Sequence, residues 1–224
     1  MKLKKIASLA LAGIMAVSML TACGEGTGNG NSGSSSSGNT NTSTGISAEV
    51  LNMSAFRSSK VVTAVDSSSL NDAVKAAAAI AGSGNSAATL NDLTELKNNT
   101  YGSYSLDMLN AAKAKMGTAK YVYDETDEWK YVQNIADNDD HTVYNMYVIA
   151  QNLGDEVIKQ KVANKLEGIY NAIEVVNPKL ADSYNYEVSV AMADWQVGKD
   201  ADSSKDGVIV GIAVTLRYDA AAFN

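Results

Sequence analysis

The chain has 224 residues, a formal net charge of −7, one cysteine and one histidine. The acidic balance argues against nucleic acid as a partner, because nucleic acids attract basic surfaces. A single cysteine excludes an intramolecular disulfide, so a packed core must stabilise the fold. The sequence shows no phosphate-binding loop, no Gly-x-Ser-x-Gly elbow and no Ser-x-x-Lys pair, and we expect no cofactor.

The N-terminal segment has the composition of an export signal. Lys2, Lys4 and Lys5 form a basic start, and an apolar stretch from Ile6 to Leu20 follows. This stretch has about 15 residues, whereas a helix needs about 20 to cross a bilayer. The segment therefore indicates a cleaved signal peptide better than a transmembrane anchor.

The tetrad Leu20-Thr21-Ala22-Cys23 resembles the lipobox of bacterial lipoproteins. The resemblance implies that Cys23 receives a diacylglyceryl group, that residues 1–22 are removed and that Cys23 becomes the first residue. Removing 1–22 takes away three lysines and changes the formal charge from −7 to −10. The implied location is the extracytoplasmic face of the cell membrane, with the lipid as the membrane contact.

A linker and one domain are expected after the signal. Between residues 24 and 45 the chain is Gly, Ser, Thr and Asn with one glutamate and no apolar residue. Such a composition predicts a flexible tether, with a typical span of roughly 25 Å. We expect residues 23–45 to be the lipidated linker and residues 46–224 to form a single globular domain.

Short helices are predicted in the first half of this domain. Three segments begin with a hydroxyl residue that suits a helix N-cap, followed by Asn or Asp in the first turn. They start at Ser69, Thr89 and Ser105, and Gly82 and Gly117 stand where helix C-terminal caps are expected.

Two further helices are predicted beyond these. One runs from about 125 to 136 with Asp124 as its cap. The stronger one runs from Asp155 to Val176, because its apolar residues recur every three or four positions. Pro178 follows and disfavours helical geometry at the preceding residue.

The last part of the chain changes to the period of a strand. Apolar residues alternate with polar or small ones from 184 to 193 and again from 208 to 218. We expect an antiparallel hairpin, with one apolar face on the helix 155–176. Residues 60–65 are the best candidate for a neighbouring strand, and residues 142–150 fit either a helix or a strand. The predicted fold class is α+β, with short N-terminal helices, one long amphipathic helix and a C-terminal hairpin in a small sheet.

Candidate binding residues are few. Aromatic residues from Tyr101 to Tyr131, including Tyr121 and Tyr123, could stack on an envelope glycan if their rings are exposed. The alternative is that these rings pack in the core.

Two places suggest a cation site, and neither is a strong pattern. His141 follows a run of acidic residues, and Asp200 and Asp202 begin a loop with alternate oxygen side chains. That loop lacks the turn glycine and the closing glutamate of a calcium-binding EF-hand. We therefore interpret it as a solvated hairpin loop and expect no metal.

These features favour a lipid-anchored, extracytoplasmic surface protein that binds an envelope component or a protein partner and is not an enzyme. A surface hydrolase acting on a cell-wall or extracellular substrate is one alternative. A structural spacer is the other. Lipidation at Cys23 is the one modification with a defined position.

Overall fold

The computed structural model describes residues 45–58, 62–80, 87, 90–97, 104–124, 129, 140–176, 185–195 and 206–217. The predictions for the lipobox with Cys23, the linker, Gly82, Pro178, Asp200 and Asp202 lie outside these residues, as does most of the predicted helix 125–136. The predicted α+β class is confirmed. The described residues include four α-helices and a six-stranded mixed sheet.

The sheet is built around the C-terminal strands. Its order is β1-β6-β7-β5-β2, and β4 also pairs with β5. The pairs β6–β7, β7–β5 and β5–β2 are antiparallel, whereas β1 is parallel to β6 and β4 is parallel to β5. The strands are β1 Val62–Ala64, β2 Thr94–Glu95, β4 Lys120–Tyr121, β5 His141–Ala150, β6 Asn185–Trp195 and β7 Gly207–Arg217.

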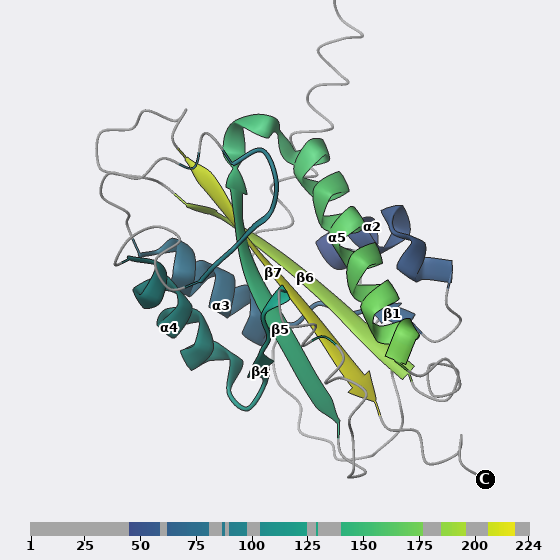
Figure 1. Ribbon diagram of the computed structural model, residues 1–224. Coiled ribbons are helices and arrows are strands. Elements are labelled where there is room, and N and C mark those ends of the chain that lie inside the picture. The colour runs from purple at the N-terminus through teal and green to yellow at the C-terminus, as the bar shows by residue number, and fades with distance from the viewer. Residues whose placement is uncertain are drawn as a thin grey trace, which may run out of the picture. The chain divides into compact units, whose positions relative to one another are not determined.

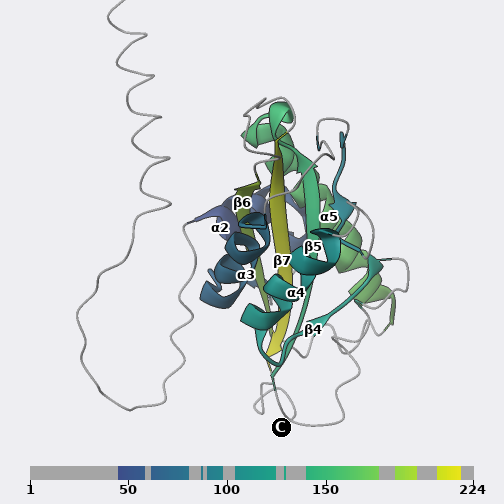
Figure 2. The ribbon, with the colours of Figure 1, turned by 90° about the vertical axis from the view of Figure 1, so that its left-hand side faces the viewer.

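Helices cover both faces of the sheet (Figures 1 and 2). The helices α2 and α5 lie on one face, and α3 and α4 lie on the other. Their bounds are α2 Ile46–Met53, α3 Ser68–Ala78, α4 Tyr104–Met116 and α5 Asp155–Val176, with short 3-10 turns at Ala55–Ser58 and Gln151–Leu153.

The long helix has the predicted bounds. Ile158, Val162, Leu166 and Ile169 are buried. They pack against the even-numbered apolar residues of β6 and β7, such as Ile212. The spacing of three and four places these side chains on one stripe of α5, and the period of two places their partners on one face of the sheet.

The prediction of a hairpin with a single apolar face is wrong. The odd-numbered face of β7 carries Ile209, Gly211 and Ala213, which are covered by α3 and α4. A Cβ atom on Gly211 would lie 2.7 Å from Cγ1 of Val74 and 2.9 Å from Cδ1 of Leu70, both on α3. The small residues on this face therefore permit an alanine-rich helix to approach the strand closely.

Two helix starts differ from the prediction by one or two residues. The hydroxyl of Ser67, not of Ser69, caps α3 and accepts a hydrogen bond from the backbone N–H of Leu70 at 3.2 Å. Helix α4 begins at Tyr104, one residue before the predicted cap Ser105. Its end is as predicted, since Gly117 has a φ of +59°, the left-handed conformation that favours glycine after a helix.

No helix follows residue 89 in the described segment 90–97, so that prediction is wrong. Thr94–Glu95 forms β2 and pairs with β5. The backbone N–H of Leu96 donates to the carbonyl of Met146, and that of Ala150 donates to the carbonyl of Leu90. Pairing with the edge of β5 thus overrides the local preference for a helix.

Pairing with neighbouring strands determines the structure of residues 141–150 and 62–64. Residues 141–150 form β5, which pairs with β7 along its whole length. The predicted strand in 60–65 is confirmed as β1, although only Val62–Ala64 is in the ladder with β6. Both assignments depend on partners that lie far away in the sequence.

Candidate functional site

A network of polar side chains lies where β2, β5 and the residues after β4 meet α5. Glu95 is buried, and its Oε1 accepts hydrogen bonds from Nδ2 of Asn145 at 2.7 Å and from the backbone N–H of Asp124 at 3.0 Å. Its other oxygen forms an ion pair with Nζ of Lys97 at 2.9 Å. The carboxylate is therefore compensated by hydrogen bonds and by one cation.

Asp124 is the second carboxylate of this network. Its Oδ1 accepts hydrogen bonds from the hydroxyl of Tyr147 at 2.9 Å and from Nε1 of Trp129 at 3.1 Å, and its Oδ2 forms an ion pair with Lys165 on α5. Lys165 also lies over the ring of Tyr147. Burial, and then the neighbouring Asp124 carboxylate, raises the pKa of Tyr147 well above its ordinary value. Both carboxylates are bound by protein groups, and the Asp124–Lys165 ion pair joins this network to α5.

Replacing Asp124 should destabilise the domain. In Asp124→Ala the buried groups of Tyr147 and Trp129 lose their acceptor, and we expect a loss of about 2–4 kcal/mol in the free energy of unfolding. Urea unfolding followed by tryptophan fluorescence would measure it. The control is Asp92→Ala, because Asp92 is exposed and lies 3.6 Å from Lys161, so its ion pair contributes about 0.5 kcal/mol or less. Equal losses in the two variants would contradict a structural role for Asp124.

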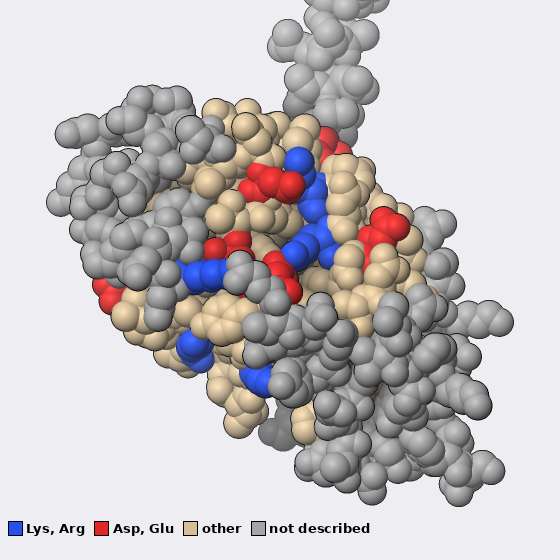
Figure 3. Space-filling view, viewed as in Figure 1, with Lys and Arg blue, Asp and Glu red and all other residues tan. Residues whose placement is uncertain are grey.

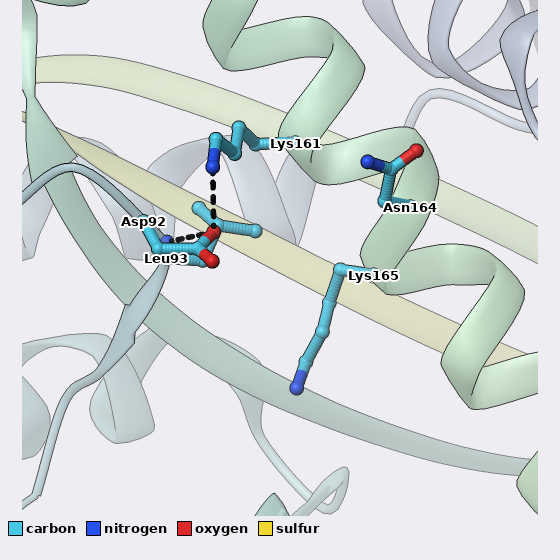
Figure 4. A pocket seen from close by; sticks show the side chains of 5 residues that line it. All are labelled: Asp92, Leu93, Lys161, Asn164 and Lys165. Atoms are coloured by element: carbon cyan, nitrogen blue, oxygen red, sulfur yellow. Dashed lines mark hydrogen bonds and ion pairs between the residues drawn. The ribbon is translucent and has the colours of Figure 1, made fainter.

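A small pocket lies beside this network (Figure 4). It has a volume of about 260 Å³ and is lined by Asp92, Leu93, Lys161, Asn164 and Lys165. Lys161 extends from α5 toward Asp92, whereas Lys165 points away from that residue (Figure 4). Both lysines are paired with carboxylates, so the pocket offers no concentrated positive charge.

A larger groove lies on the opposite side of the sheet, at one end of the face that α3 and α4 cover. We call it the polar groove. It has a volume of about 760 Å³ and lies between Ser67–Ser69 at the start of α3, the residues after α4 and the ends of the central strands. It exists because α3 begins at Ser68 and therefore leaves the last rows of the sheet uncovered.

The floor of the polar groove is made of side chains in register. Thr215 on β7 stands opposite Thr142 on one side and Glu187 on the other. The hydroxyls of the two threonines are 2.8 Å apart. In the next row Arg217 binds Asp140 at 2.5 Å and Glu187 at 2.6 Å. On the odd-numbered face of β7 the residues thus change from apolar to polar at the point where α3 begins.

Of the predicted site residues that the structure describes, His141 is the only one that lines this groove. His141 is half-buried and lies next to Thr142. Thr142, Thr215, Glu187 and Arg217 were missed by the sequence reasoning. The sequence signal for these residues lies in β7. On its odd-numbered face, the apolar residues Ile209 and Ala213 are followed by the polar residues Thr215 and Arg217.

The aromatic residues do not form an exposed stacking row where they are described. Tyr121 contacts Tyr123 edge-on with ring centroids 5.2 Å apart and Tyr144 with centroids 5.3 Å apart. Its hydroxyl donates to the carbonyl of Leu96 at 2.7 Å. Tyr144 and Leu96 belong to the core under α3 and α4, so Tyr121 is a packing residue. Tyr123 is half-buried beside it.

These buried tyrosines predict a loss of stability at high pH. Burial raises the pKa of Tyr144 from 10 to about 12, and burial followed by the charge of Glu95 raises the pKa of Tyr121 further. The folded state favours the neutral phenols, so this contribution is complete below pH 10 and falls as the pH rises from 10 through 12. Urea midpoints between pH 8 and about 12, compared with phenolate absorbance, would measure it. Tyr144→Phe should show a weaker pH dependence, and a flat midpoint over this range would contradict the prediction.

The visible face of the domain carries charges of both signs. In Figure 3 acidic and basic side chains are interspersed around the hollow between α5 and the sheet. Among the described residues, no group of three or more His, Cys, Asp or Glu side chains is arranged to hold a metal ion. None of the described helices combines the length and the apolar character needed to cross a membrane.

No family model matches the chain. No curated protein and no solved structure matches it either.

Proposed function

We propose that this chain is a lipid-anchored protein of the extracytoplasmic face of a bacterial cell membrane. Its folded part, with short N-terminal helices, one long helix and a C-terminal hairpin, binds an envelope component, either a glycan or a protein. The anchoring rests on Cys23 and the lipobox resemblance. The binding rests on the polar groove, which is the observation that carries this function.

The volume and chemistry of the polar groove support binding. Its volume of about 760 Å³ is within the usual range of ligand sites, roughly 300–1,000 Å³. Thr142, Thr215, Glu187 and Arg217 offer donors and acceptors on a rigid sheet. A sheet floor holds such groups in fixed positions, which lowers the entropy lost on binding.

The groove also lies beside the start of the folded domain. Asp66 lines it and accepts a hydrogen bond from the hydroxyl of Ser47 on α2 at 3.0 Å. A Cβ atom on Gly45 would lie 3.2 Å from Oδ2 of Asp66. The proposed linker ends at Gly45, so the groove lies near the point where the linker would join the folded domain.

Lipidation is tested by replacing Cys23. Cells that produce the wild-type chain or Cys23→Ser are labelled with a radioactive fatty acid and fractionated. We expect the label and the normal processing to be lost in Cys23→Ser, because a serine hydroxyl forms no thioether. A variant that keeps the label would contradict anchoring at Cys23.

A truncated chain tests whether the lipid is the only attachment. The chain from Ile46 onward, placed behind a conventional cleavable signal, should be released in soluble form. If it stayed on the membrane in high salt, the folded domain itself would hold a membrane partner.

A further inference from the structure

The polar groove has a nearly balanced charge. Its lining includes the carboxylates of Asp66, Asp140 and Glu187 and the cations of Lys120 and Arg217. Arg217 is shared between two of these carboxylates. The positive and negative groups therefore largely neutralise one another, and neither an anion nor a cation finds a strong excess of the opposite charge.

The floor has hydrogen-bonding capacity that its internal contacts do not use. One hydroxyl of the pair Thr142 and Thr215 donates to the other across 2.8 Å. The accepting hydroxyl keeps its own hydrogen, which is directed elsewhere, and both oxygens have further lone pairs. Ser68 and Ser69 add exposed hydroxyls at the rim.

The groove is poorly suited to an extended peptide. The strands of its floor are internal at this point, because β7 pairs with both β5 and β6. Their backbone groups are used in these ladders, so a peptide gains no added-strand hydrogen bonds. Most of the lining residues are polar, and the apolar ones are Val65, Met116, Ala119, Val143 and Ala213.

We infer that the ligand of the polar groove is a neutral oligosaccharide, bound through its hydroxyl groups by Thr142, Thr215 and Glu187. This inference rests on the proposed binding function and specifies its ligand. Sugar hydroxyls donate and accept at the same atom, as the threonine pair does, and they need no excess charge in the site. The carboxylate of Glu187 and the guanidinium of Arg217 fix the orientation of the sugar by charge-assisted hydrogen bonds.

The experiment compares binding by the full chain and by a double variant. The chain is purified in a detergent without a sugar headgroup and tested on an array of neutral and charged oligosaccharides, and each hit is titrated by calorimetry. The double variant Thr142→Val with Thr215→Val replaces both partners of one hydrogen bond by groups of the same shape, so the fold should be kept. Binding of the neutral oligosaccharide should weaken by roughly tenfold or more, because the ligand loses two hydrogen bonds.

Two further variants make the result specific. Glu187→Gln should also weaken binding, and it leaves the threonine pair intact. Thr94→Val is the matched control, because Thr94 is a half-buried threonine on β2, outside the groove lining. Thermal unfolding of each variant shows whether weaker binding comes from a lost contact in a folded protein or from loss of the folded state.

Three results would overturn the inference. They are binding to none of the neutral oligosaccharides, binding only to charged ones, and neutral binding that is unchanged in the double variant and in Glu187→Gln. The fatty-acid label on Cys23 is read in separate samples, so a failure of glycan binding is distinguishable from a failure of anchoring.

Discussion

Ile212→Asp is expected to prevent the domain from folding. Ile212 is fully buried on the central strand β7 and packs in the core under α5. The substitution places an unpaired carboxylate there at a cost of about 4 kcal/mol or more. A domain of this size has only about 5–15 kcal/mol to lose. Circular dichroism and thermal unfolding of the purified variant would measure the effect.

Two neighbouring positions on the opposite face serve as comparisons. Ala213→Asp should be nearly as severe, because Ala213 is only 3% exposed and belongs to the core under α3 and α4. Thr215→Asp should be milder, because Thr215 lies in the polar groove beyond the start of α3. A mild Ala213→Asp would contradict the burial of both faces of the sheet.

Gly211→Val is expected to lower the melting temperature by about 4–12 °C, which corresponds to a net cost of about 2–3 kcal/mol from overpacking. The first added carbon would already lie 2.7 Å from Val74, 2.9 Å from Leu70 and 3.2 Å from Sδ of Met146. All three side chains are fully buried, so relief of these contacts requires repacking between α3 and the sheet. The better strand propensity of valine offsets a part of this cost, up to about 1 kcal/mol.

The control for this change is Gly168→Val in α5. No atom lies within 4 Å of a Cβ at Gly168, and the backbone there is helical. Valine is slightly better than glycine inside a helix, so the melting temperature should stay the same or rise by about 1 °C. Calorimetry of both variants tests whether close packing of α3 on β7 requires glycine at position 211. Similar melting temperatures for the two variants would contradict it.

Periodicity alone predicted the elements that carry their own pattern. Helix α5 has the predicted bounds because a repeat of three and four over 22 residues is incompatible with a strand. The even face of β6 and β7 was also predicted, since alternation defines which side chains share a face. The N-terminal lipobox belongs to the same class of local pattern, and Cys23 stays a prediction.

The covered odd face of β7 has a signal in the sequence, although the prediction of a one-sided hairpin is wrong. The alternation predicts a one-sided hairpin with Gly211 and Ala213 on its second, uncovered face. Small residues opposite an apolar face suit a helix that packs closely as well as they suit solvent. The alanine-rich α3 supplies that helix, and this pairing of distant segments is not encoded in either pattern alone.

Local sequence by itself determined the type of the long, regular elements, because their hydrophobic period is a property of consecutive residues. Only the tertiary structure decided the state of residues 90–97 and of β5, because their backbone partners are distant in the chain. The same holds for the polar groove. Thr142 and Glu187 stand beside Thr215 through strand register, and the groove is open because α3 begins at Ser68, which side-chain patterns in any one segment do not specify.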